Sequence, residues 1–170
     1  SDLDKRLQKL REEADIAREK VMQLVAALEN GDVTRAEQLV LEGANTEDAF
    51  LEAALTGKVK AVTELRTKKN INCRDGAALR LSFDKGYLDV AEVLMNLDDT
   101  SPHAIHANPH VNGNVILSAA IRSNAPEKVS LICRAFNDAG GANLLREWYV
   151  NARRWNYHQS ADVIQKRLEQ

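Results

Sequence analysis

Five turns recur along this chain with the same neighbours on both sides. Each turn is centred on a glycine or an asparagine, the residues that best tolerate a left-handed backbone after the end of a helix. These residues are Gly31, Gly57, Gly86, Asn124 and Asn156. A large apolar or aromatic residue lies seven positions before each of them, and a small residue lies four positions before. The large set is Leu24, Phe50, Leu79, Leu117 and Tyr149, and the small set is Ala27, Ala53, Ser82, Ala120 and Ala152.

The same register continues after each turn. Five positions later the residues are Ala36, Val62, Ala91, Val129 and Ala161, and eight positions later they are Leu39, Leu65, Leu94, Ile132 and Ile164. Because residues three apart share a helix face, each pair of positions marks the buried stripe of one helix. One helix–turn–helix unit cannot bury both of its faces, whereas stacked units share a core. The pattern therefore predicts an all-α fold of the α-solenoid class.

Two stretches resemble a known family. DGAALRLSFDKGYLDVAEVLMN, residues 75–96, resembles an ankyrin repeat, with a small-residue first helix, a glycine turn and the second helix GYLDVAEVLM. LENGDVTRAEQLVLEGAN, residues 28–45, resembles the same family down to the GAN after its second helix. Residues 21–170 are thus similar to a divergent ankyrin-repeat protein with about five degenerate repeats. The resemblance implies stacked ankyrin-like repeats that bind proteins through a concave surface.

The chain also departs from that family. The usual Thr-Pro-Leu-His start is absent, with DGAALR and GNVILS in its place, and asparagine replaces the turn glycine at Asn124 and Asn156. Arg80 and Ser118 stand where the family has its histidine. An α-solenoid of the tetratricopeptide or HEAT kind is the alternative architecture.

Residues 1–29 form an N-terminal helical segment that runs into the first repeat, ahead of a repeat array over residues 30–170; we expect one domain overall. Residues 2–29 lack Gly and Pro and predict one long helix. Its apolar residues alternate four and three apart, as in a heptad seam: Leu3, Leu7, Leu10, Ala14, Ala17, Val21, Leu24 and Leu28. We interpret the helix as a cap on the array.

The alternatives are a coiled coil that makes a homodimer and the end of a longer upstream helix. Since the chain begins at Ser1 rather than Met, we expect it to be part of a larger protein.

The C-terminal stretch carries two tryptophans, Trp148 and Trp155, seven apart beside Arg153 and Arg154. Such a cluster can stack nucleic-acid bases, but aromatic residues more commonly bury their area in a terminal cap. We favour the cap and expect no nucleic-acid partner. A last helix over residues 159–168 would close the array.

Composition points away from several functional classes. A formal net charge of −2 over 170 residues does not indicate a nucleic-acid or membrane partner, and no apolar run is long enough to span a membrane. The two cysteines, Cys73 in a loop and Cys133 on an apolar stripe, form neither a disulfide framework nor a zinc knuckle. This favours a reducing, cytoplasmic setting. No catalytic motif stands out, so we expect no enzyme activity and no cofactor.

The stretch SPHAIHANPH, residues 101–110, contains His103, His106 and His110 at ligand-like spacing. Its two prolines prevent a continuous helix. Three histidines and an aspartate would hold zinc only if they converged. We interpret the stretch as an ordinary connection between units. A recognition or pH-sensitive loop and a metal site are the alternatives.

Charge is unevenly distributed along the chain. Residues 29–52 are mainly acidic and residues 58–85 mainly basic, which suits the steering of a charged protein partner. The predicted contact residues are Lys68, Lys69, Arg74, Arg80, His103, His106 and Arg122. We expect a protein–protein interaction module of a larger protein, and degenerate repeats of this type suggest an effector directed at a host cytoplasm. The alternatives are an oligomerisation domain built on the N-terminal helix and a metal-binding or enzyme-accessory domain at His103, His106 and His110.

Overall fold

The computed structural model describes residues 1–170, and every regular element in it is a helix. The ten helices are α1 (Asp2–Glu29), α2 (Val33–Leu41), α3 (Thr46–Leu55), α4 (Val59–Leu65), α5 (Cys73–Lys85), α6 (Leu88–Met95), α7 (Val111–Arg122), α8 (Pro126–Cys133), α9 (Ala139–Arg154) and α10 (His158–Leu168). The predicted all-α class is confirmed. None of these helices has the length and hydropathy that crossing a bilayer would require.

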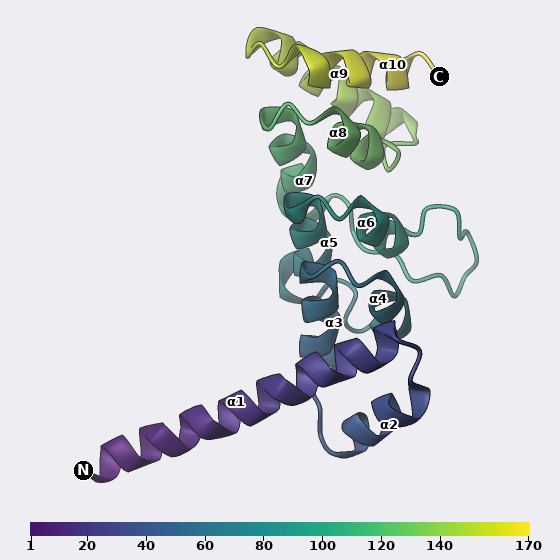
Figure 1. Cartoon of the computed structure of the whole chain (residues 1–170). Coiled ribbons are helices and arrows are strands. Elements are labelled where there is room, and N and C mark those ends of the chain that lie inside the picture. Colours follow the sequence, from purple (N-terminus) through teal and green to yellow (C-terminus); the bar gives the residue numbers. More distant parts are fainter.

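Consecutive helices pair and lie against the neighbouring pair in chain order (Figure 1). Helices α3, α5 and α7 contact one another in succession in one layer, and α4, α6, α8 and α10 do so in a second. The last pair departs from this order, because α9 is held mainly by α10. The buried apolar residues form one cluster that runs from Val21 to Ile164, so the interior is continuous along the molecule.

The repeat positions that the sequence marks as buried are buried, with one exception. The five small residues that precede the turns all lie in the interior, as do both sets of positions that follow the turns. Tyr149 is the exception, and it is only half-buried. The guanidinium of Arg153 lies over its ring at 5.3 Å, and Arg153 Nε donates to its hydroxyl at 3.3 Å. Tyr149 therefore packs against the interior on one side, and Arg153 covers part of its ring.

All five turns have the same backbone geometry. The turn residues have φ angles between 48° and 79°, as predicted. In each turn the N–H that follows the turn residue donates to the carbonyl of the small residue, at 2.8 to 3.2 Å. The turn residue itself donates to the carbonyl three residues earlier. These two bonds define the Schellman motif, which satisfies carbonyls that the end of a helix leaves unpaired.

Two helices receive a capping side chain from another part of the chain. Helices α4 and α10 have no side-chain cap of their own. Glu29 Oε2 instead accepts from the Ala61 N–H at 3.0 Å, and Asn124 Oδ1 accepts from the Ser160 N–H at 3.2 Å. Both N–H groups lie in the first turn of their helix, where no backbone acceptor is available. These bonds fix one helix pair against the next.

Helices α5 and α7 begin in the same unusual way. Three consecutive residues at each start have left-handed angles, over residues 74–76 and residues 112–114. These segments lead into the stretches DGAALR and GNVILS, residues 75–80 and 113–118. The Arg74 side chain disfavours this conformation, which aspartate tolerates better. At Gly76 an added Cβ would lie 3.3 Å from the methyl groups of Val111, so the two starts lie close together.

Helix α1 is continuous, as predicted, but only its C-terminal part is covered. Its buried residues are Val21, Leu24, Val25 and Ala27, and α1 contacts α2, α3 and α4. No residue before Val21 is buried. Figure 1 shows the first half of α1 projecting away from the paired helices. The expected capping contact is therefore confined to the second half.

Substitution of the two turn asparagines separates backbone conformation from cross-capping. Asn124→Gly keeps the turn but removes the oxygen that accepts from Ser160, so we expect a loss of about 1 kcal/mol in the free energy of unfolding. Asn156 has the same positive φ but no side-chain hydrogen bond, so Asn156→Gly should change it by less than about 0.5 kcal/mol. Urea denaturation followed by circular dichroism measures both. Equal losses would contradict the cross-cap.

The small residues should not tolerate enlargement. Ala53 is fully buried where helix pairs meet, so Ala53→Leu should lower the free energy of unfolding by about 1 to 3 kcal/mol through overpacking. Ala26→Leu makes the same change at an exposed position of α1 and should have little effect. Thermal unfolding of the two variants gives the comparison, and similar melting temperatures would show that close approach at Ala53 is unimportant.

Candidate binding surface

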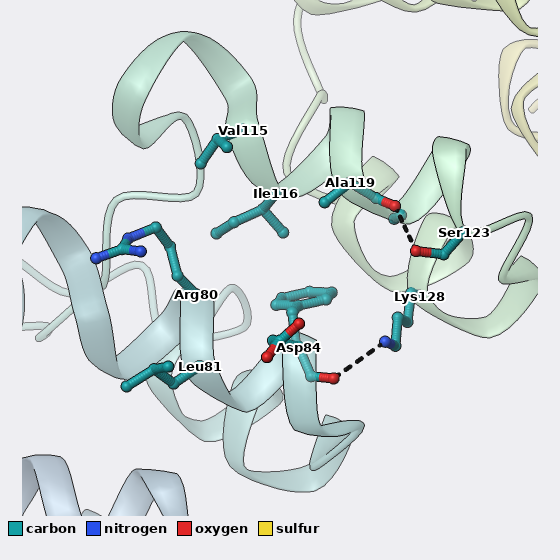
Figure 2. Close-up of a pocket in the computed structure, with 10 residues that line it drawn as sticks. Arg80, Leu81, Asp84, Val115, Ile116, Ala119, Ser123 and Lys128 are labelled. Atoms are coloured by element: carbon teal, nitrogen blue, oxygen red, sulfur yellow. Dashed lines mark hydrogen bonds between the residues drawn. The ribbon is translucent and has the colours of Figure 1, made fainter.

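A hollow of about 230 Å³ lies between α5 and α7. Leu81 of α5 and Ile116 and Ala119 of α7 belong to its lining. Figure 2 shows the two α7 side chains across from α5, with Arg80, Asp84 and Lys128 around the hollow. Lys128 Nζ, at the start of α8, donates to the carbonyl of Asp84 at 3.4 Å. An apolar lining is thus bordered by charges of both signs.

A larger hollow, of about 760 Å³, adjoins the first. It is lined by Ala14, Ala17, Arg18, Val21, Gly43, Asn45, Asp48, Leu51, Glu52, Leu55, Arg74, Ala77 and Leu81. Because Leu81 lines both hollows, they form one surface, which we call the first-helix groove. It runs from α1 over α3 and α5 to α7.

Two of the predicted contact residues, Arg74 and Arg80, lie in the first-helix groove and are joined to each other. Arg80 donates through Nε to the carbonyl of Asp75 at 3.0 Å and through Nη2 to that of Arg74 at 3.3 Å. Arg80 thereby holds the left-handed start of α5. Arg74 pairs with Asp48 of α3 at 3.1 Å. Both partners are substantially exposed, so the pair contributes little to stability and leaves both charges accessible.

Lys68 and Lys69 lie in the connection between α4 and α5. Both are exposed and neither forms an ion pair. Asn70 holds the turn beneath them: its side chain accepts from the Thr67 N–H at 2.7 Å and donates to the Leu65 carbonyl at 2.9 Å. Two free ammonium groups therefore sit on an ordered turn.

The three histidines between α6 and α7 are engaged separately. His106 Nδ1 lies 2.9 Å from the Met95 carbonyl oxygen at the end of α6, whereas His103 is exposed. His110 Nδ1 lies 2.8 Å from Asn114 Oδ1, and its ring meets Phe136 edge-on at 4.7 Å. No group of three or more His, Cys, Asp or Glu side chains is placed to share a metal ion.

The α6–α7 connection is fixed at its second half. The Ala107 N–H donates to the Leu94 carbonyl at 2.8 Å, and the Asn108 N–H donates to Asn72 Oδ1 at 2.7 Å. Figure 1 shows the connection projecting past α6, on the side away from α5 and α7. His103 and His106 therefore belong to a different part of the surface from the first-helix groove.

Arg122 lies at the end of α7 beside the last helix pair. Its guanidinium carbon is 5.9 Å from the centre of the Trp155 ring, a cation–π distance. Trp155 meets Trp148 edge-on at 6.4 Å, so the two tryptophans of the C-terminal stretch are in contact. Arg122 is held by this cluster and is separate from Arg74 and Arg80.

Neither cysteine is prepared for nucleophilic chemistry. Burial raises the pKa of the Cys133 thiol to about 12, in line with its predicted place in the interior. Burial, reinforced by the neighbouring carboxylate of Glu47, raises the pKa of Cys73 to about 11. Cys73 is the first residue of α5 and is half-buried, not part of an open loop. Both thiols stay protonated at neutral pH, and the thiolate is the reactive form.

The residues predicted as contacts include none of the apolar side chains that line the groove. Leu81 and Ala119 each directly precede a small residue of the repeat, at Ser82 and Ala120. That offset, five before the turn residue, marks the side of the first helix next to the buried stripe. In the other three units the same offset holds Ala26, Glu52 and Asn151, so this register alone does not mark an apolar contact.

Thiol modification checks the two cysteine environments. In the folded protein at pH 8 we expect both thiols to react with a disulfide reagent far more slowly than in denaturant, with Cys73 the faster of the two. The rate at Cys73 should rise as the pH approaches 11, because the thiolate fraction grows toward its raised pKa. A Cys73→Ser variant assigns the signal. Rapid reaction of folded protein at pH 7 would contradict this.

Comparison with known proteins does not assign this chain to a family. No model of a protein family, no curated protein and no solved structure matches this chain.

Proposed function

We propose that this chain is a protein-binding scaffold whose first-helix groove receives a segment of a partner protein. The observation that carries the proposal is the position of Leu81, a half-buried apolar side chain shared by two adjoining hollows. Large apolar side chains left open within a groove with polar edges are typical of interaction sites.

The finer architecture belongs to the same proposal. We assign the paired helices to an α-solenoid of ankyrin-like repeats. Five Schellman turns of one geometry support this assignment, as do the contacts of α3 with α5 and of α5 with α7. In such an array each first helix turns one side toward the interior and leaves another free. The free sides of adjacent helices then form one continuous binding surface.

The shape and chemistry of the groove suit an amphipathic segment. Leu51 and Leu55 of α3 and Leu81 of α5 provide apolar contacts, while Arg74, Arg80 and charged neighbours border them. Helical segments commonly bind by placing one apolar face in such a groove. The charges of both signs at the border would set orientation and exclude mismatched partners more than they would add affinity.

Lys68 and Lys69 would act at one edge of the interaction. They are unpaired ammonium groups on an ordered turn. Because the backbone of this turn is already ordered, binding an acidic partner costs this chain little backbone conformational entropy. The free thiols at Cys73 and Cys133 fit a reducing compartment, and we propose that the partner is met in the cytoplasm.

Peptide selection with a matched set of variants tests the groove. Peptides that bind the chain are selected from a random library, and their affinities are then measured by fluorescence anisotropy. Leu81→Glu should weaken the selected peptides by about tenfold or more, because it places a charge in the apolar part of the groove. Lys68→Glu with Lys69→Glu should weaken acidic peptides specifically, through long-range attraction.

Thr63→Glu provides the control, because Thr63 is an exposed residue of α4 in the other helix layer. It should leave every affinity unchanged, and circular dichroism should show the same helix content in all variants. Peptides that lose affinity with Thr63→Glu but not with Leu81→Glu would place the binding surface elsewhere and contradict the proposal.

A further inference from the structure

The heptad seam of α1 is covered along only half of its length. Val21 and Leu24 of the seam are buried against the neighbouring helices. Leu3, Leu7 and Leu10 continue the same stripe, and their exposed fractions are 63%, 40% and 59%. Three leucines aligned on one face of a projecting helix form an apolar strip that nothing in one copy of the chain covers.

We infer that a second copy of this chain covers the exposed seam, with the two α1 segments antiparallel and Leu7 of each copy opposite Leu10 of the other. In this register Leu3 lies opposite Ala14, so the leucine strip of each copy is matched over its whole length. The inference goes beyond the proposed groove function and does not depend on it.

The charges beside the seam specify this orientation. In an antiparallel pair, residues on corresponding sides of the two seams face each other. With Leu7 opposite Leu10, Asp4 of each copy lies beside Arg11 of the other. On the other side, Arg6 of each copy lies beside Glu13 of the other. Both kinds of pair join opposite charges and each occurs twice, so every flanking contact is attractive.

A parallel pair is disfavoured on two grounds. It would place Arg6 of each copy beside Arg11 of the other, which brings like charges together twice. It would also bring the paired helices of both copies to the same end of α1, where the seam from Val21 onward is already covered. The antiparallel pair places the two bodies at opposite ends of the coiled segment.

The expected dimer is weak and reversible. The exposed seam spans little more than two heptads, and short isolated helical pairs bury less area than stable dimers need. Since α1 is already a helix anchored in the body at Val21 and Leu24, less ordering is required than for free peptides. Association in the micromolar range is therefore the expected outcome.

Sedimentation equilibrium on the full chain, at concentrations of about 5 to 500 µM, tests the dimer. We expect reversible dimerisation that Leu10→Lys abolishes. Ile16→Lys is the matched control, because Ile16 is equally exposed at 59% but lies off the seam; it should dimerise as the unchanged chain does. A monomer at every concentration overturns the inference, as does a dimer that survives Leu10→Lys.

A charge exchange tests the orientation. Arg11→Glu places Glu beside Asp4 twice in the antiparallel pair, so the dissociation constant should rise by about tenfold. Adding Asp4→Lys restores opposite charges and should restore the dimer. In a parallel pair, Arg11→Glu would instead relieve the repulsion with Arg6 and strengthen the dimer. That strengthening would overturn the antiparallel arrangement.

Discussion

The architecture depends on one residue in each unit that serves both the turn and the packing. The small residue four positions before each turn accepts, through its carbonyl, the N–H that follows the turn residue. Its short side chain lies at the buried contact with the next helix. A larger side chain would separate the helices, and a turn residue that resists positive φ would break the hydrogen bond. Chain reversal and close packing are therefore set at the same place in each unit.

This double constraint explains which parts of the fold can be predicted from one sequence. Positions tied to the turn by a fixed offset, such as Ala53 and Asn124, are local in origin, so their burial and backbone conformation follow from the register. Contacts between distant segments produce no regular pattern in the sequence. Nothing in the sequence identifies Glu29 as the cap of α4, or places His106 against the carbonyl of Met95. The same limit applies to the candidate site. The charge of Arg74 makes it a contact residue that the sequence can predict, whereas only the structure identifies Leu81, because its role depends on the two hollows that it lines.

The left-handed start of α5 connects the fold to the groove. Arg74 adopts a positive φ angle that costs roughly 1 to 2 kcal/mol for a residue with a Cβ, and Asp75 adopts one at a smaller cost. Arg80 offsets part of this cost by donating to both of their carbonyls. The outcome is a rigid turn that directs the Arg74 side chain to Asp48, across the α3–α5 boundary of the groove. A partner would meet an exposed charge on a backbone that Arg80 already holds in place, so little backbone ordering would be needed on binding.

The two proposals meet at one end of the groove. Ala14 and Ala17 of α1 line the larger hollow, and the antiparallel dimer places the first turn of the second α1 opposite Ala14. A second copy would therefore lie at the α1 side of the hollow that Leu51 and Leu55 also line, away from the hollow between α5 and α7. Binding at the α1 end of the groove would compete with dimerisation, whereas binding at the α7 end would not. Because linked equilibria are reciprocal, a partner that occupies the α1 end must weaken the dimer by the same factor by which the dimer weakens that partner.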